Sequence, residues 1–192
     1  MKKIFLTSFF IFSVLLAPAQ ASFQFSYGLN YESDKDTSVA ENSEYARTYH
    51  KIFIGASMNG AKTLFLGQNI NIWNRELKQG TSTVAAEYSL LELGPKLLWY
   101  LTQERSSYLS LEWNPYVVGD RKILNIESEI RGNSLGVSFG YRFKLSKHFG
   151  IGASLNYTKV NIKTETVSQI ESDKSDGMSM IVPMLEIAYL TK

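Results

Sequence analysis

The sequence predicts an all-β protein: an eight-stranded antiparallel up-and-down transmembrane β-barrel that follows a cleaved signal peptide. Three observations predict this fold, namely an apolar leader, eight segments of alternating apolar and polar residues, and connections that alternate between short and long. The composition of the 192 residues, 44% hydrophobic and 20% charged, is typical of one folded domain. Cysteine is absent, which excludes disulfide scaffolds, thiolate metal sites and a thiol nucleophile.

Residues 1–21 have the features of a secretory signal peptide. Two lysines precede an apolar run over residues 4–16, and an Ala-Gln-Ala sequence ending at Ala21 provides a small-residue cleavage site. The apolar run is too short to cross a bilayer as a permanent helix. We therefore expect a barrel domain over residues 22–192, with equal numbers of basic and acidic residues. This balance gives no support to nucleic-acid binding.

The remaining chain shows the two-residue period of β-strands with one apolar and one polar face. A helical period would scatter the apolar residues around a cylinder. The apolar faces of the eight expected strands are Phe23, Phe25, Tyr27, Leu29 and Tyr31; Ile52, Ile54, Ala56 and Met58; Leu64, Leu66, Ile70 and Ile72; Leu91, Leu93, Pro95, Leu97, Trp99 and Leu101; Leu109, Leu111, Trp113, Pro115 and Val117; Leu135, Val137, Phe139, Tyr141, Phe143 and Leu145; Phe149, Ile151, Ala153, Leu155 and Tyr157; and Ile181, Pro183, Leu185, Ile187 and Tyr189.

Short turns are expected at one end of this meander and long polar loops at the other. The turns lie near residues 59–61, 103–107 and 146–148, and the long segments near residues 32–46, 75–86, 118–132 and 160–177. Residues that face each other in a hairpin must share a side of the sheet. This rule predicts that Leu145 pairs with Phe149, Ala56 with Leu64, and Leu101 with Leu109, with Gly60 at positive φ in the first turn.

The bulk of the apolar faces indicates that they point away from the barrel axis. The alternative is a soluble lipocalin-like barrel, whose apolar face would surround a greasy ligand. However, an eight-stranded barrel has room inside only for its own side chains or one small ligand. The opposite faces carry small and polar residues such as Gly136, Ser138 and Gly140, which suit a crowded lumen. An apolar exterior is stable only in lipid, so we expect a transmembrane barrel.

Over residues 22–190 this pattern resembles the small bacterial outer-membrane β-barrels of the OmpA, OmpX and OmpW type. The resemblance implies a monomer in a Gram-negative outer membrane, inserted by the outer-membrane assembly machinery and surrounded by outer-membrane lipid and lipopolysaccharide. It also implies periplasmic termini and four long extracellular loops. Such barrels usually end in a strand with a terminal aromatic residue, whereas here Leu190, Thr191 and Lys192 follow Tyr189.

Two groups of residues are candidate site residues in this orientation. Aromatic rings prefer the membrane interface, and the expected periplasmic girdle consists of Phe23, Phe25, Trp99, Phe143, Phe149 and Tyr189. The expected charge network in the lumen consists of Lys51, Glu92, Lys96, Glu112, Arg142, Lys144 and Glu186. We expect these charges to plug the lumen with ion pairs, because buried charges must be compensated. A selective or gated pore is the functional alternative.

Prolines on the apolar faces conflict with a complete hydrogen-bond ladder, because proline has no backbone N–H. Pro95 and Pro115 are expected to face each other, so we predict a β-bulge at that place. In the same register Lys96 lies opposite Asn114, which makes Glu112 its diagonal partner.

The sequence favours a non-enzymatic outer-membrane barrel with a structural or surface-interaction, adhesion-like role through its four long loops. A narrow pore or passage for small or hydrophobic molecules, resembling the OmpW type, is the alternative. A lipid A-modifying enzyme is a further alternative, but His50 is expected to face outward and His148 to be solvated in a turn, and neither has an evident Ser and carboxylate partner. No metal site or cofactor is expected. Strand extension near residues 118–132 and 160–177 would favour adhesion through a sheet edge.

Overall fold

The computed structural model of this chain describes residues 22–36, 43–79, 83–123 and 126–191. It contains eight strands, in agreement with the predicted number: β1 (Phe23–Asp36), β2 (Ser43–Ser57), β3 (Leu64–Gln79), β4 (Thr83–Tyr100), β5 (Ser107–Ile123), β6 (Ile126–Lys144), β7 (Phe149–Val167) and β8 (Ile170–Leu190). The expected signal peptide lies outside the described residues. Within the described ranges there is no helix that is long and apolar enough to cross a membrane.

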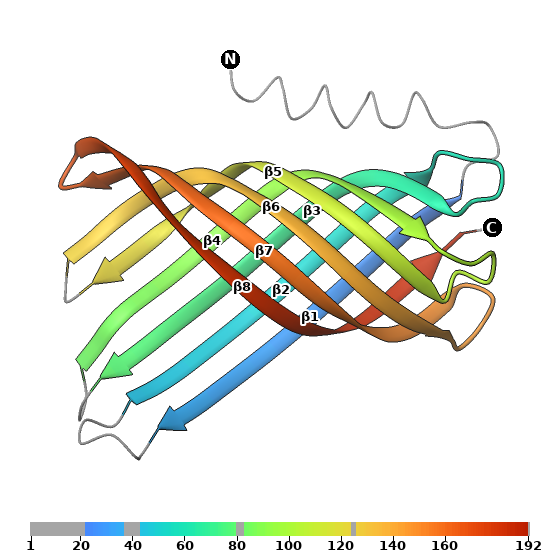
Figure 1. The fold of residues 1–192 in the computed structure, drawn as a ribbon, viewed down its shortest axis with the longest axis horizontal. Helices are drawn as coiled ribbons and strands as arrows, with labels where there is room; N and C mark the ends of the chain where they lie inside the picture. Colours follow the sequence, from blue (N-terminus) through green and yellow to red (C-terminus); the bar gives the residue numbers. More distant parts are fainter. Residues whose placement is uncertain (1–21, 37–42, 80–82, 124–125, 192) are drawn as a thin grey trace.

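Each strand pairs antiparallel with the next, and β8 pairs with β1 to close the barrel (Figure 1). The strands are staggered around it. A row of paired residues that starts at Gln24 passes through Lys96 and Glu112 and reaches β8 at Met180, whereas Gln24 itself pairs with Leu190 on β8. The ten-residue offset between Met180 and Leu190 tilts the strands against the barrel axis, as closure requires.

The apolar faces point outward, as predicted. Phe143 and Leu185 on this outer face are 64% and 72% exposed. The inward faces are crowded, and glycine is required at two of their positions: a Cβ atom on Gly140 would collide with the ring of Tyr108, and one on Gly136 with the carboxylate of Glu112. The chain therefore surrounds a filled interior with a continuous apolar exterior.

The predicted bulge is present, and it changes which way Val117 points. Between the pairs Leu93 with Tyr116 and Lys96 with Glu112, two residues of β4 oppose three residues of β5, which include Pro115. The extra residue reverses the alternation of β5 beyond this point. Val117, which was expected to face outward, is therefore buried inside.

One of the three predicted hairpin registers is correct and two are wrong by two residues. Phe143 pairs with Ile151, as the turn at residues 146–148 requires. In contrast, Ala56 pairs with Leu66 and not with Leu64. Similarly, Leu109 lies opposite Trp99 and not Leu101.

The turn between β2 and β3 is longer than predicted because a side chain closes it. Asn59 Oδ1 accepts hydrogen bonds from the backbone N–H groups of Thr63 and Leu64, at 2.9 and 3.1 Å. The residue at positive φ is Lys62, at 55°, and not Gly60. In the turn between β4 and β5 the corresponding residue is Arg105, at 57°.

The four long polar segments are mostly extensions of the strands and not loops. β1 and β2 pair as far as Asp36 with Ser43, and β7 and β8 as far as Val167 with Ile170. The predicted extension of the third and fourth segments is confirmed, whereas the expectation of long loops in the first two is wrong. We call this end of the barrel the hairpin end, and the opposite end, which holds the turns at residues 58–63, 101–106 and 145–148, the short-turn end (Figure 1).

The seam between β1 and β8 is closed over only part of its length. These strands form six pairs, from Gln24 with Leu190 to Leu29 with Leu185. The backbone N–H of Leu190 donates to the carbonyl of His148, which precedes β7. The backbone N–H of Thr191 donates in the opposite direction, to the carbonyl of Phe23 in β1. Because these directions alternate along a strand, the nitrogen of Pro183 faces β1, where it cannot donate. The β1–β8 ladder ends at Leu185, two residues from this proline.

Candidate functional site

The interior of the barrel is filled by successive layers of side chains, of which the first lies near the short-turn end. There the buried Arg142 forms an ion pair with Glu186 at 2.9 Å. Its Nη1 atom also donates to the Tyr100 hydroxyl at 2.5 Å, and Tyr100 donates to Gln24 at 2.9 Å. Tyr108 donates to Glu186 at 2.6 Å. These contacts join strands from all sides and close the lumen at this level.

A second ion pair occupies the middle of the lumen. Lys51 Nζ lies 2.6 Å from Glu112 Oε1 and 2.8 Å from Asn156 Oδ1. Lys96 lies directly opposite Glu112 in the ladder, which corrects the predicted pairing with Asn114. Its ammonium group lies over the ring of Phe53, 5.6 Å from the centroid. The partner of Glu112 is therefore Lys51 on a different side of the barrel, and not Lys96.

Glu92 is compensated by neutral donors. Its carboxylate accepts hydrogen bonds from Trp73 Nε1 at 2.7 Å, Ser134 Oγ at 2.8 Å, Asn71 Nδ2 at 3.0 Å and Asn114 Nδ2 at 3.1 Å. Four donors occupy the acceptor positions that a carboxylate offers. No cation lies within ion-pair distance of Glu92 among the residues that the structure describes, so its carboxyl group is held by neutral hydrogen-bond donors.

An apolar layer fills the lumen toward the hairpin end. Tyr49 and Trp73 stack here with ring planes 4° apart. They belong to a buried cluster that also contains Leu90, Val117, Ile130, Val160, Ile162, Val182 and Met184. Met178 and Met180 pack against this cluster from β8, next to the open part of the seam. The lumen is thus polar around Lys51 and Glu112 and apolar around Trp73, and a second buried cluster of Phe53, Phe65, Leu98, Tyr100 and Tyr108 lies toward the short-turn end.

Ion pairs between the extended strands support the hairpin end. Arg121 contacts Glu165 at 2.5 Å and Asp176 at 3.3 Å, and Lys174 contacts Glu165 at 3.3 Å. A hydrogen bond from the Ser128 hydroxyl, together with Arg121 and Lys174, lowers the pKa of Glu165 to about 2. The proximity of Glu165 in turn raises the pKa of Arg121. Both groups are therefore ionised at neutral pH and hold β5, β7 and β8 together.

Two polar side chains fill the open part of the seam. Asn30 Nδ2 donates to the Pro183 carbonyl at 2.8 Å, and Arg47 Nη2 donates to the Ile181 carbonyl at 3.2 Å. Arg47 also forms an ion pair with Glu32 of β1. Side chains thus replace a few of the backbone hydrogen bonds that β1 and β8 do not make.

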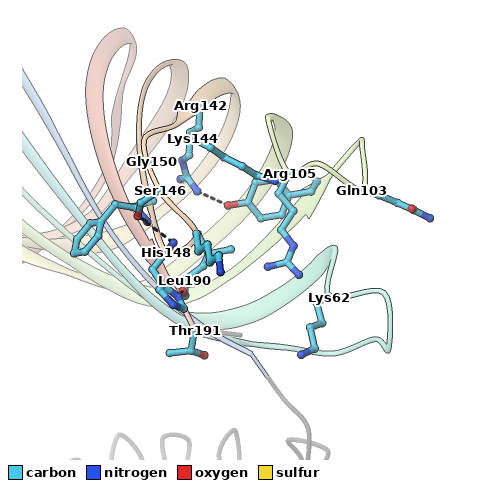
Figure 2. Close-up of a pocket in the computed structure, with 14 residues that line it drawn as sticks. Lys62, Gln103, Arg105, Arg142, Lys144, Ser146, His148, Gly150, Leu190 and Thr191 are labelled. Atoms are coloured by element: carbon cyan, nitrogen blue, oxygen red, sulfur yellow. Dashed lines mark hydrogen bonds between the residues drawn. The ribbon is translucent and has the colours of Figure 1, made fainter.

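A cavity of about 310 Å³ opens at the short-turn end (Figure 2). Arg142 and Tyr100 of the first layer form part of its wall, and side chains from all three short turns surround it, among them Lys62, Arg105 and His148. The cavity is therefore separated from the rest of the lumen by the first layer of side chains.

The structure places most of the predicted lumen charges in the interior. The buried ones are Lys51, Glu92, Lys96, Glu112, Arg142 and Glu186. The two ion pairs belong to one hydrogen-bond network, because Asn156 accepts from Lys51 and donates to Ser154, which donates to Glu186. Lys144 has the expected parity but is exposed, because it lies at the mouth of the cavity where the barrel ends.

The predicted aromatic girdle lies on the outer surface at the short-turn end. Phe25 and Tyr189 are paired, Tyr189 and Phe149 are paired, and their rings form one row across β1, β8 and β7. Phe149 and Tyr189 have centroids 5.0 Å apart with tilted planes. Phe23, Trp99 and Phe143 are exposed on the same outer face, so the aromatic rings surround this end of the barrel.

The two histidines are far apart, and each has a structural contact. His50 lies on the outward face, where its Nδ1 atom is 2.7 Å from the Tyr27 hydroxyl. His148 is half-buried and not fully solvated, because its Nδ1 atom bonds to the Leu190 carbonyl at 2.8 Å. In the described part of the chain, no three His, Asp or Glu side chains are arranged to hold a metal ion.

Several interior residues were missed at the sequence level. Trp73, Tyr100 and Tyr108 have the same parity as the polar inward residues of their strands, and this parity alone identifies them as inward. Arg121 and Glu165 were read as loop residues, and no local pattern marks such residues as partners across strands. Their contact depends on strand lengths that the polar sequence does not reveal.

No protein-family model matches the sequence, and no curated protein sequence matches it either. Among solved structures, neisserial surface protein A (NspA) has a TM-score of 0.53 at 12% sequence identity, covering 88% of this chain and 96% of NspA. The outer membrane protein OprG from Pseudomonas aeruginosa has a TM-score of 0.48 at 10% identity, covering 91% of this chain and 97% of OprG. This chain therefore has the eight-stranded up-and-down fold of small outer-membrane β-barrels.

Proposed function

We propose that this protein is an outer-membrane barrel with a sealed lumen that acts by surface interaction at its hairpin end. In this proposal the short-turn end and both termini of the mature chain lie in the periplasm, and the extended strands project from the cell. The apolar exterior and the aromatic rings at the short-turn end support a membrane position, because such a surface is stable only in lipid.

The free edge of β8 is the observation that carries the surface-interaction proposal. From Met184 back to Ile170, β8 has no backbone pairing with the described residues of β1. Over this stretch it is paired with β7. An unpaired edge offers donors and acceptors to an added strand. The edge also carries Glu171, Asp173 and Asp176, so it suits an extended partner with basic side chains and disfavours self-association through like charge.

The layered lumen supports a sealed barrel. The Arg142 layer, the Lys51–Glu112 pair and the apolar layer around Trp73 lie in succession along the axis. An eight-stranded barrel has space for side chains but not for a water column when its inward faces carry large residues. We therefore expect no discrete ion conductance from the purified protein in planar bilayers, and reproducible unit openings would contradict the sealed lumen.

A binding experiment tests the free edge. A fluorescent peptide of alternating Thr and Lys serves as a basic, strand-forming probe, and its binding to the folded protein is followed by fluorescence anisotropy. The variant Ser179→Pro removes a donor that points toward the seam, because residue 179 has the parity of Pro183, and leaves the β7 ladder intact. Ser179→Ala is the matched control, because it loses the hydroxyl but keeps the backbone N–H.

We expect the peptide to bind the native protein and Ser179→Ala alike and to bind Ser179→Pro much more weakly. A heat-dependent shift in gel mobility verifies that each variant is folded. Equal binding to all three proteins would show that the peptide attaches to surface charge and not to the free edge, and the strand-addition proposal would fail.

A lateral passage for apolar molecules is the second candidate function. Val182 and Met184 of the apolar layer lie directly inside the open seam, so an apolar molecule has a short route from the lumen to the membrane. Uptake of an apolar fluorescent dye by cells that produce the protein tests this route. The passage predicts faster uptake than in cells without the protein, whereas a purely adhesive role predicts no difference.

Catalysis has no support in the described contacts of the histidines. A lipid A-modifying enzyme would change the mass of lipid A in cells that overproduce it. We expect the lipid A mass spectrum to be unchanged, and a new species that depends on His50 or His148 would overturn this part of the proposal.

A further inference from the structure

The cavity at the short-turn end has a wall of unusual charge. Six cationic or titratable nitrogen side chains line it: Lys62, Arg105, Arg142, Lys144, Lys147 and His148. Among the described residues, no carboxylate side chain lines the cavity. These side chains come from the three short turns and the adjacent end of β6, and Figure 2 shows Lys62, Arg105, Arg142, Lys144 and His148 at this end of the barrel. Such a concentration of positive charge in one concave site raises the local potential and attracts anions.

Most of these cations lack a counter-charge among the residues that the structure describes. Arg142 is paired with Glu186, but Lys62, Arg105, Lys144 and Lys147 have no carboxylate within ion-pair distance in the described ranges. Glu104 is adjacent to Arg105 in sequence, yet it neither lines the cavity nor pairs with Arg105. At the hairpin end, in contrast, Arg121 has two carboxylate partners. The repulsion within the cavity is therefore left for a ligand to offset.

The backbone of two short turns supports the same conclusion. Lys62 and Arg105 both have left-handed φ values, 55° and 57°, a conformation that is unfavourable for an L-residue. Glycine would adopt it without that cost, and Gly60 lies in the same turn but at another position. In both turns the left-handed position is occupied by a cation that lines the cavity, so these turns retain a cation where stability favours glycine.

We propose that this cavity binds a phosphate group. Lysine ammonium groups act as point charges for phosphate oxygens, and the Arg105 guanidinium offers paired donors. The cavity is also bordered by Leu190 and by Phe149, which is 57% exposed and belongs to the outer aromatic girdle. The site thus lies where the barrel interior meets the surface that we assign to lipid. The phosphate is carried either by a phospholipid headgroup or by a soluble periplasmic molecule.

Calorimetric titration of the folded full-length chain in a neutral detergent with inorganic pyrophosphate tests the soluble source. The inner double variant Arg105→Gln with Lys144→Gln removes two cations that have no structural ion pair. The outer double variant Lys122→Gln with Arg131→Gln removes the same charge at the hairpin end and is the matched control. We expect the inner variant to bind pyrophosphate at least about tenfold more weakly, and the outer variant to bind within about twofold of the native protein.

Native mass spectrometry of the same three proteins tests the lipid source. Each protein is released from nanodiscs that contain either phosphatidylglycerol and phosphatidylcholine or phosphatidylcholine alone, and the retained lipid is counted. A headgroup site predicts one retained phosphatidylglycerol on the native protein and the outer variant, and none on the inner variant. Gel mobility before and after heating verifies that all three proteins are folded.

The two arms distinguish the sources and can overturn the site. Selective loss of pyrophosphate binding in the inner variant identifies a soluble phosphate ligand. Selective loss of retained phosphatidylglycerol alone identifies a lipid headgroup. If neither probe binds, or if the inner and outer variants lose binding equally, the cavity is not a phosphate site. None of these outcomes depends on the free edge of β8, so the proposal stands or fails independently of the surface-interaction role.

Discussion

At the hairpin end Arg121 lies between Glu165 and Asp176, and Arg47 and Arg131 also have acidic partners, whereas Arg75 lies over the ring of Tyr45. At the short-turn end Lys62 and Arg105 have no acidic partner in the described part of the chain, and both have a left-handed backbone conformation that is unfavourable for a residue with a side chain. The difference shows that charge serves two purposes in one barrel. Paired charges extend the strands beyond the apolar belt, whereas unpaired charges keep an anion-attracting cavity available.

The same two strands also differ between the two ends. Near the short-turn end β1 and β8 form a regular ladder. From Met184 toward the hairpin end, the side chains of Asn30 of β1 and Arg47 of β2 donate to carbonyl groups of β8 instead. The stagger of the barrel carries β8 past β1, and Pro183 removes a donor at the point where pairing ends. The β1–β8 ladder therefore closes the seam near the short-turn end, and the open part of the seam lies toward the hairpin end.

The largest expected effect is that of removing the buried acid at the short-turn end. Glu186→Ala leaves Arg142 buried without its partner and also removes the acceptor of Tyr108. We expect the free energy of unfolding in lipid vesicles to fall by about 3–5 kcal/mol in a urea titration. The comparison predicts a smaller loss for Glu165→Ala at the hairpin end, because Arg121 keeps Asp176 as a partner and the Lys174 side chain is 43% exposed.

The double variant Glu186→Ala with Arg142→Met is the control for this prediction. It removes both charges, so it should recover a large part of the stability that Glu186→Ala loses. If Glu186→Ala and Glu165→Ala proved equally mild, Arg142 would have to be hydrated in the folded barrel, and the first layer would not close the lumen.

The second prediction concerns the seam. Pro183→Val restores an N–H group that faces β1 and keeps an apolar side chain on the outer surface. We expect the β1–β8 ladder to lengthen and the free energy of unfolding to rise by about 1 kcal/mol. Hydrogen exchange of the amides of residues 30–36 should slow at the same time. Unchanged exchange there would show that the stagger alone, and not the proline, ends the pairing.

Much of this fold is predictable from alternation, because a strand with one face in lipid must repeat every two residues. Leu135, Phe139 and Phe143 therefore point outward as expected. Proline at positions 95 and 115 likewise predicted the bulge, since a missing donor has to be accommodated somewhere in a closed ladder. Local periodicity and backbone chemistry were sufficient for these features.

Features that depend on contacts across the barrel were not predictable in this way. Lys51 pairs with Glu112 across the lumen, and no local spacing distinguishes this partner from Lys96. The outer extensions of the strands have polar residues on both faces, so they carry no apolar period. The charged cavity combines residues from three turns. In two of these turns the conformation was not predicted, because Asn59 closes one through its side chain and Arg105 takes a left-handed φ in the other.

The third prediction concerns Lys62, a cation at a left-handed position, and separates the effect of backbone strain on stability from the effect of charge repulsion. Lys62→Gly should raise the free energy of unfolding by about 0.5 kcal/mol, because glycine adopts φ near 55° without strain, and it should also weaken pyrophosphate binding. Lys62→Ala loses the same charge but keeps a Cβ atom, so it should weaken binding without any gain in stability. A gain of equal size in both variants would attribute the effect to charge repulsion and not to the backbone.

The smallest expected effect is the pH dependence of the paired end. The pKa of Glu165 is lowered to about 2 in the folded protein, while an unfolded glutamate titrates near 4.3. Its contribution to stability is therefore complete above about pH 4.3 and is lost as the pH falls toward 2. The stability difference between the native protein and Glu165→Gln, measured by urea unfolding at several pH values, should shrink over this range. A difference that stays constant from pH 7 to pH 2 would mean that Glu165 stabilises the hairpin end through packing and hydrogen bonds and not through its charge, and the electrostatic contrast between the two ends would then rest on the short-turn cavity alone.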